Sequence, residues 1–533
     1  MRNLIYIFTA LCLVGLLSGC YKDDSTSFQI PLADVTIASH ENIPFYAGVE
    51  SSYTPTVEWG DKSQEDFEYK WTLNGREVIS TEFTLKYVFR DMGTPYLTFQ
   101  MIDKETGIVY GKDFKASVSA KYLLGWVILS EGTDQSSHLS FIEMDGYVAH
   151  PDIYAELYPG DALGSKPYGL AETCNSKRDQ IMVLQEGGEG PISLNGLSFV
   201  KVMPLQQEFI GEQFPEENFK AKAVLFTHRG TEMLIAESGN MYDRITAKGR
   251  TSDVSFQDAI FSTNPYPHIA GETSFTHYTF PGASTNFTPL YDGLNRRWLG
   301  YHTVSPTGTQ SSIPALLPGT VSFPEGFDFC TGMAEDVELV YAQSHAESTS
   351  YLNLTNVLKR GSTYYANDSK LTLSTSNYKI TVSAFSQKEF APGYTINENT
   401  VFCMPRGTGT SYNADVHIFF NVGQKVYFFH YDTGLTYLFR DFSKEENAPQ
   451  GDIVALTQRA DTKELGVTFS DGHFFIMNSD KAKLDNIRQS NLDPENIDNG
   501  LRLAHITGIP GKPVATIFKF GKTSNYTGAK VAK

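Results

Sequence analysis

The sequence predicts an all-β protein, in which a small β-sandwich is followed by a large β-propeller-like region of about seven blades. Short apolar runs with period-two alternation recur along nearly the whole chain. Gly, Asn, Asp and Pro separate these runs, and helical periodicity is scarce. The chain has 533 residues, of which 41% are hydrophobic. It is therefore long enough for more than one domain and apolar enough to fill their cores.

The first residues are organised as a secretion signal. Arg2 supplies a positive charge, and Leu4 to Leu17 form an apolar segment that is shorter than the ~20 residues needed to span a bilayer. Leu17 to Cys20 (LSGC) resembles the lipobox of bacterial lipoproteins, in which the cysteine receives the lipid. We predict a signal peptide over 1–19 and lipidation of Cys20. An ordinary signal peptide or a retained anchor helix is the alternative.

A short polar tether follows over residues 20–32. Tyr21 to Asp24 (YKDD) resembles the Lys-Asp/Glu-rich export signal of Bacteroidota-type lipoproteins. The resemblance implies a lipid anchor in the outer membrane, with the protein facing the cell exterior. A solvated linker is the alternative for so short a run. No second run of 18 or more apolar residues occurs in the sequence.

Residues 33–120 alternate in the manner of short β-strands. Phe67 to Leu73 is one such run, and the Asn74-Gly75 pair after it favours a type I′ hairpin turn. Tyr96 to Ile102 is another, and Asp103 follows it at a position where its carboxylate can accept hydrogen bonds from turn amides. This pattern predicts a compact sandwich of short strands.

Two stretches in this region, YKWTLNG (Tyr69 to Gly75) and GTPYLTFQMID (Gly93 to Asp103), resemble the PKD-like domain of bacterial surface lipoproteins. The resemblance implies an immunoglobulin-like β-sandwich that acts as a spacer or contact module. It places Trp71 in the core. We expect Trp59 to be a core aromatic as well.

Residues 121–520 contain paired apolar runs that recur roughly every 45–60 residues, close to the period of known propeller blades. A propeller leaves few exposed strand edges, whereas sandwiches in series would need linkers, and no Pro/Ser/Gly-rich linker interrupts the region. Leu352 to Arg360 is a candidate short helix, and 521–533 is a C-terminal tail. The paired runs are Trp126–Ser130 with His138–Gly146, Gln180–Gln185 with Leu197–Val202, Ala223–Thr227 with Glu232–Glu237, Val337–Tyr341 with Tyr351–Leu354, Val416–Phe420 with Lys425–Tyr431, Glu464–Phe469 with His473–Met477, and Leu290–Tyr301 with its own turn.

The order of lipobox, PKD-like domain and propeller-like region resembles the PKD-like family lipoproteins of Bacteroidota. The resemblance implies an accessory surface binder that works beside a porin-type transporter and its lid-like lipoprotein in a starch-utilisation-like uptake locus. It implies a glycan or peptide ligand without deciding between them. Two alternatives remain: a surface glycoside hydrolase or lyase on a propeller scaffold, and an adhesion or assembly protein.

Charge and motif content favour binding over catalysis. The formal net charge of −18 argues against nucleic acid and other polyanionic ligands. The sequence contains no H-E-x-x-H, paired Cys-x-x-Cys, calcium-loop or Gly-x-Ser-x-Gly motif. We predict no catalytic residue, no metal site and no cofactor. A glycosidase would need two carboxylates about 5–10 Å apart, and the candidates are Glu325, Asp328, Glu335 and Asp336.

Three cysteines remain once Cys12 leaves with the signal and Cys20 is lipidated. They are Cys174, Cys330 and Cys403, which are far apart in the sequence. Buried free thiols are the expected state, and one disulfide among the three is the alternative.

The recognition surface is predicted in residues 262–302, a segment rich in aromatic residues, Pro, Gly and Thr. Exposed aromatic rings can stack on a sugar or peptide, and large loops on one propeller face commonly carry function. Ordinary core and turn aromatics are the alternative. The candidate ligand-binding residues are Tyr266, His268, Tyr278, Tyr291 and Trp298.

Overall fold

The computed structural model divides the chain into two compact units, Met1–Ala120 and Lys121–Lys533. This division falls between the same two residues as the predicted domain boundary. The predicted signal peptide, tether and C-terminal tail lie outside the described residues. The described residues are 33–39, 42–89, 92–174, 179–226, 232–246, 259–261, 275–278, 287–303, 311–346, 351–374, 376–377, 379–404, 417–459 and 463–519.

The first unit is a β-sandwich. A five-stranded sheet in the order β2-β9-β8-β5-β6 faces the two-stranded sheet β3-β7, and β1 pairs with β4. The elements are β1 (Thr36–Ile37), β2 (Ile43–Tyr46), β3 (Glu50–Tyr53), β4 (Val57–Glu58), η2 (Gln64–Asp66), β5 (Phe67–Leu73), β6 (Glu77–Ser80), β7 (Leu85–Val88), β8 (Tyr96–Asp103) and β9 (Val109–Ser119).

The core of the sandwich is aromatic. Trp71 on β5 is fully buried, as predicted, and its ring centroid lies 4.6 Å from that of Phe99. Tyr53, on the opposing sheet, reaches the same core, with its ring 6.1 Å from that of Trp71. Trp59 is half-buried, and its ring packs 5.7 Å from that of Phe67.

Both turns predicted in this unit are confirmed. Asn74 and Gly75 have φ angles of 50° and 68°, the left-handed pair that a type I′ hairpin between β5 and β6 requires. Asp103 Oδ1 accepts hydrogen bonds from the backbone N–H of Glu105 at 2.9 Å and of Thr106 at 3.0 Å. Local side-chain chemistry therefore sets these two turns.

The second unit contains seven sheets in its described residues, each of four or five strands. Within each sheet, consecutive strands run antiparallel, except that β25 pairs parallel with β29. The strands are β10 (Gly125–Glu131), β11 (Ser137–Glu143), β12 (Ala149–His150), β13 (Ser165–Cys174), β14 (Asp179–Gly187), β15 (Ile192–Asn195), β16 (Lys201–Pro204), β17 (Ala221–Phe226), β18 (Glu232–Ala236), β19 (Met241–Thr246), β20 (Ala259–Phe261), β21 (Phe275–Tyr278), β22 (Phe287–Asp292), β23 (Arg297–Thr303), β24 (Ser311–Ser312), β25 (Leu316–Pro318), β26 (Val337–Ala346), β27 (Tyr351–Arg360), β28 (Thr363–Leu373), β29 (Ile380–Glu389), β30 (Phe402–Cys403), β31 (His417–Val422), β32 (Lys425–His430), β33 (Leu435–Asp441), β34 (Ile453–Gln458), β35 (Glu464–Phe469), β36 (Phe474–Asn478), β37 (Arg502–Ile506) and β38 (Lys512–Lys519).

The second unit also contains short helices in its described residues: α2 (Ile153–Leu157), α3 (Lys481–Arg488), η3 (Leu205–Glu208) and η6 (Phe442–Lys444). Asp152 caps α2 by accepting a hydrogen bond from Ala155 N, and Asp480 caps α3 by accepting one from Ala482 N. None of the helices in the described residues is long and apolar enough to cross a bilayer.

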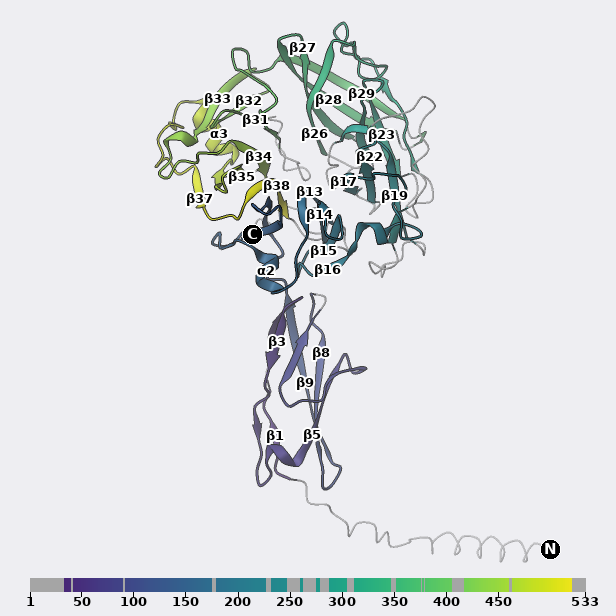
Figure 1. Ribbon diagram of the computed structural model, residues 1–533, viewed down its shortest axis with the longest axis vertical. Helices are drawn as coiled ribbons and strands as arrows, with labels where there is room; N and C mark the ends of the chain where they lie inside the picture. The colour runs from purple at the N-terminus through teal and green to yellow at the C-terminus, as the bar shows by residue number, and fades with distance from the viewer. Residues whose placement is uncertain are drawn as a thin grey trace, which may run out of the picture. The chain divides into compact units, whose positions relative to one another are not determined.

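The sheets of the second unit close into a ring (Figure 1). The last strand, β38, pairs with β10 of the first sheet, so the two ends of this unit share one sheet. Trp126 and Phe518 of that sheet pack against Phe474 of the preceding sheet, β34–β37, which completes the circle. Each neighbouring pair of sheets shares a hydrophobic cluster of this kind. Radially repeated antiparallel sheets closed in this way are a β-propeller.

Two of the predicted elements are wrong. Leu352 to Arg360 belongs to β27 and is not a helix, because Leu352 and Leu354 face one cluster while Val357 faces the other. Leu197 to Val202 is not the strand that follows β14; β14 pairs with β15. The N–H groups of Leu197 and Ser198 donate to the Asn195 side chain instead, at 2.8 and 3.2 Å, which turns the chain there.

Candidate functional site

The predicted recognition segment, 262–302, is only partly described. Tyr266 and His268 lie outside the described residues, and Tyr278 lies in β21, of which the backbone alone is described. Tyr291 and Trp298 are described in full and are 4% and 0% exposed. Their rings pack 5.2 Å apart. The prediction that these two form an exposed stacking surface is therefore wrong.

The physical reason lies in the sheet to which they belong. Tyr291 and Trp298 are cross-strand partners on β22 and β23, and the face that carries them packs against β27–β29 of the next sheet. The sequence shows that both rings belong to one hairpin-like run, Leu290 to Tyr301, but it cannot show which sheet covers them.

Replacement of Trp298 by Phe should therefore affect folding directly. We expect the free energy of unfolding to fall by about 1–2 kcal/mol, because the smaller ring leaves a cavity. The loss is limited because the indole N–H finds no hydrogen-bond partner among the described residues. Chemical denaturation of Trp298→Phe, with Leu294→Ala as the control at the exposed turn of the same hairpin, measures this difference. An unchanged midpoint would contradict the core assignment.

A Ser–His–Asp chain, which no motif in the sequence indicates, lies on the first sheet of the second unit. Ser136 Oγ lies 2.9 Å from His138 Nε2, and His138 Nδ1 lies 2.7 Å from Asp152 Oδ2. Ser136 and His138 lie at the β10–β11 hairpin, and Asp152 is the N-cap of α2. The only sequence signal is the i, i+2 spacing of Ser136, which directly precedes β11, and His138 within it, because residues two apart in extended chain point to the same side.

The surroundings of this chain do not fit a nucleophile. Ser136 Oγ also donates to Asp134 Oδ1, at 2.5 Å, and this bond is the largest cause of the lowered pKa of Asp134. The backbone N–H of Ser136 donates to the same carboxylate, and that of Ser137 donates to Gly164 O, so neither is left for an oxyanion. The arrangement joins the hairpin to the start of α2.

Two of the carboxylates considered for a glycosidase, Asp328 and Asp336, are also engaged. Asp336 Oδ2 accepts from Arg360 Nε at 2.7 Å, and Arg360 also donates to the carbonyl of Glu325. Asp328 accepts from Cys330 N at 2.9 Å, which stabilises a turn. Glu335 is exposed and lies 3.9 Å from Arg296.

Acid catalysis on a glycoside needs a carboxyl group with a raised pKa. Six carboxyl groups of the described residues instead have a lowered pKa and are held ionised: Asp66, Asp103, Asp134, Asp161, Asp441 and Asp471. The same residues contain no group of three or more His, Cys, Asp or Glu side chains that could hold a metal ion.

Two of the cysteines are buried thiols outside any disulfide, as expected. They are Cys330 and Cys403, and the Cys403 thiol donates to Met404 O at 3.9 Å. Burial raises the pKa of the Cys330 thiol to about 12, so it stays protonated and unreactive at neutral pH. The side chain of Cys174 is not described.

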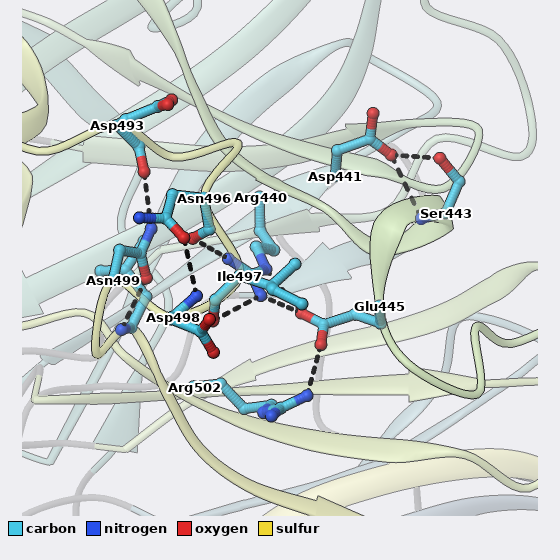
Figure 2. A network of polar contacts seen from close by, with 11 residues as sticks. Arg440, Asp441, Ser443, Glu445, Asp493, Asn496, Ile497, Asp498, Asn499 and Arg502 are labelled. Atoms are coloured by element: carbon cyan, nitrogen blue, oxygen red, sulfur yellow. Dashed lines mark hydrogen bonds and ion pairs between the residues drawn. The ribbon is translucent and has the colours of Figure 1, made fainter.

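A buried ion-pair network fastens the sheet β30–β33 to the loop before β37 (Figure 2). Arg440 Nε donates to Glu445 Oε1 at 2.6 Å, and Arg502 Nη1 donates to Glu445 Oε2 at 2.6 Å. Arg440 also donates to the carbonyls of Asn496 and Ile497. Because the Arg440 and Glu445 side chains are buried and join two segments of the chain, the network stabilises the fold.

The fold defines the class of this protein: an all-β chain with an N-terminal β-sandwich followed by a β-propeller. The model of the PKD-like family matches residues 20–167. The resemblance predicted from Tyr69 to Gly75 and Gly93 to Asp103 is therefore confirmed. No curated protein matches the chain.

Solved structures similar to this chain include propeller proteins of low sequence identity. A quinonprotein alcohol dehydrogenase-like protein from Bacteroides thetaiotaomicron has 11% identity and a TM-score of 0.37, with 92% of this chain and 100% of that chain covered. The Nup133 β-propeller domain of Vanderwaltozyma polyspora has 9% identity and a TM-score of 0.34, with 65% and 88% covered. The Cps50 (Swd1) β-propeller domain of Myceliophteria thermophila has 9% identity and a TM-score of 0.36, with 66% and 89% covered.

Proposed function

We propose that this chain is a non-catalytic cell-surface lipoprotein that captures a glycan or peptide for an outer-membrane uptake system. The observation that carries the proposal is the LSGC sequence from Leu17 to Cys20. The match to the PKD-like family begins at Cys20, the residue at which a processed lipoprotein would start. In this proposal the propeller binds the ligand, and a porin-type transporter with a lid-like lipoprotein takes it up.

The engagement of the candidate catalytic groups in contacts within the protein supports a binding role. The Ser136 hydroxyl is held by Asp134, and the carboxylates Asp328 and Asp336 are held by turn donors and by Arg360. A glycan and peptide array probed with the chain lacking residues 1–20 tests the proposal. Specific retention of one ligand class without turnover is the expected result, and rapid turnover of any arrayed compound would contradict it.

Replacement of Cys20 by Ala should release the protein from the membrane. The thiol is the site of the proposed thioether to diacylglycerol, and two or more acyl chains are needed for stable anchoring. Metabolic labelling with an alkyne fatty acid should mark the wild-type chain in the membrane fraction and leave Cys20→Ala unlabelled. Cys12→Ala, in the apolar segment of the signal, should keep the label. Equal labelling of Cys20→Ala and wild type would refute the lipoprotein assignment.

A further inference from the structure

A row of amide side chains crosses the sheet formed by β26–β29. The register pairs Asn356 on β27 with Asn367 on β28, and Asn367 with Gln387 on β29. Side chains of directly paired residues lie on the same face of a sheet, with Cβ atoms about 5 Å apart. The three amides therefore form one continuous strip, which we name the amide row. It lies on the face that carries Leu354 and Leu358, next to the sheet β21–β24.

The two asparagines of the amide row are buried, and their amide groups have no partner among the described residues. Asn356 and Asn367 are 1% and 0% exposed. Among the described residues, neither the Nδ2 nor the Oδ1 atom of either side chain has a hydrogen-bond partner, and Gln387 Nε2 and Ser369 Oγ also have none. Buried polar atoms in native proteins almost always have a partner. So many exceptions on one patch indicate that a hydrogen-bonding molecule belongs there.

Aromatic pairs flank the amide row on both sides. In the register, Ser369 and Phe385 form the neighbouring row on one side, and Tyr365 lies in the row on the other side. The Phe385 ring packs 4.8 Å from that of Phe323, and the Tyr365 ring packs 5.1 Å from that of Phe327. Phe323, Tyr365 and Phe385 are only partly buried. The patch thus combines hydrogen-bonding groups in its centre with apolar rings at its rim.

The amide groups and aromatic rings of this patch favour a neutral ligand over a charged one. An amide offers both a donor and an acceptor, which matches the hydroxyl groups of a sugar, and the flanking rings match the apolar C–H face of a pyranose. The row Ala342, Asn356, Asn367, Gln387 contains no charged side chain. A charged ligand would therefore be buried without a counter-charge, which is strongly unfavourable.

We propose that the amide row is a binding site for one neutral sugar unit of a glycan ligand. This inference rests on the proposed function, which leaves glycan and peptide open, and it commits to the glycan. Because Asn356 and Asn367 are covered, the sugar reaches them when the segment 321–334, which packs on this face, moves aside. Arg360 holds that segment by donating to the carbonyl of Glu325, and it also pairs with Asp336, two residues beyond the segment.

The test is calorimetric titration of the chain lacking residues 1–20 with glucose, galactose, mannose, xylose and N-acetylglucosamine. We expect saturable binding of at least one sugar, weakened 10-fold or more in the double variant Asn356→Leu/Asn367→Leu. Asn353→Leu, the same substitution on the opposite face of β27, should bind as the wild type does. Gln387→Leu, at the half-buried end of the amide row, supplies a milder variant if the double variant does not fold.

The outcomes separate the inference from the proposed function. Array binding of a glycan that survives in Gln387→Leu and in the double variant would overturn the site and leave the function standing. Retention of peptides alone would also overturn the site. A wild-type chain that retains no arrayed ligand would overturn the function. A crystal soaked in the sugar that shows only water at Asn356 and Asn367 would overturn the site. The site would also be overturned if the Asn→Leu variants were more stable than the wild type and bound the sugar with the same affinity.

Discussion

Removal of β38 is expected to unfold most of the propeller. A chain truncated after Pro510 loses the strand that pairs with β10 along its whole length. It also loses the buried side chains of Ile517 and Phe518, each of which contributes about 1.5–3 kcal/mol. The ladder hydrogen bonds and the buried contact of Lys519 Nζ with Leu123 O, at 2.8 Å, are lost as well. Since a folded domain is stable by only ~5–15 kcal/mol, this loss approaches the whole stability of the ring.

Thermal unfolding followed by circular dichroism measures this effect. We expect the truncated chain to lack a cooperative transition or to aggregate through the exposed edge of β10. The control ends at Lys519 and should unfold as the full chain does, because it keeps every strand that closes the ring. The substitution Gly511→Ala should disturb the same ring closure less severely than removal of β38. Gly511 has φ of 66°, and a Cβ there would lie 2.1 Å from Glu131 O, at the end of β10. If the chain without β38 unfolds at the wild-type temperature, ring closure does not stabilise the propeller.

Replacement of Arg440 by Met should destabilise the second unit by about 3–5 kcal/mol, as expected when one partner of a buried ion pair is removed. Arg440 is 1% exposed and Glu445 is 5% exposed. Without Arg440, the Glu445 carboxylate keeps only Arg502, and the carbonyls of Asn496 and Ile497 lose their donor. The loop before β37 should then detach from β33 (Figure 2).

Urea denaturation of Arg440→Met measures the loss, and Lys444→Met is the matched control. Lys444 is four residues further along the chain and forms a 3.1 Å pair with Glu495, but both side chains are about half exposed. Exposed pairs contribute little, so the control should remain close to wild type. Equal effects of the two substitutions would show that burial does not govern the strength of these ion pairs.

Local features were predictable because nearby residues cause them. The Asn74-Gly75 turn follows from the tolerance of these two residues for positive φ. The turn at Asp103 follows from a carboxylate that accepts hydrogen bonds from the N–H groups two and three residues further along the chain. Alternation of apolar residues located the β10–β11, β31–β32 and β35–β36 hairpins, whose partners are close in sequence. The prediction of a helix at Leu352 to Arg360 was wrong because both faces of β27 are buried. Apolar and polar residues therefore do not alternate clearly along this strand.

Site residues were predicted less well, because the exposure of a side chain depends on which other part of the chain packs against it. An aromatic side chain such as Trp298 has the same sequence signature on a binding surface and between two sheets. Nothing in the sequence marks Asn356 and Asn367 as buried or as site residues, because an Asn in a strand ordinarily faces solvent. The Ser136–His138–Asp152 chain was missed because Asp152 is brought to the hairpin by the α2 cap.

The amino-acid sequence was sufficient to predict that this chain is all-β, that a PKD-like sandwich precedes a longer repetitive region, and that turns lie at Asn74-Gly75 and after Asp103. These properties depend on neighbours within a few residues, whose sterics and hydrogen bonds act in the unfolded chain as well. Only the tertiary structure decided that β38 closes on β10 nearly 400 residues away, that Tyr291 and Trp298 are core, and that an unpartnered amide row crosses β27–β29. Those outcomes depend on which surfaces exclude water from one another, and only the closed ring of sheets establishes that.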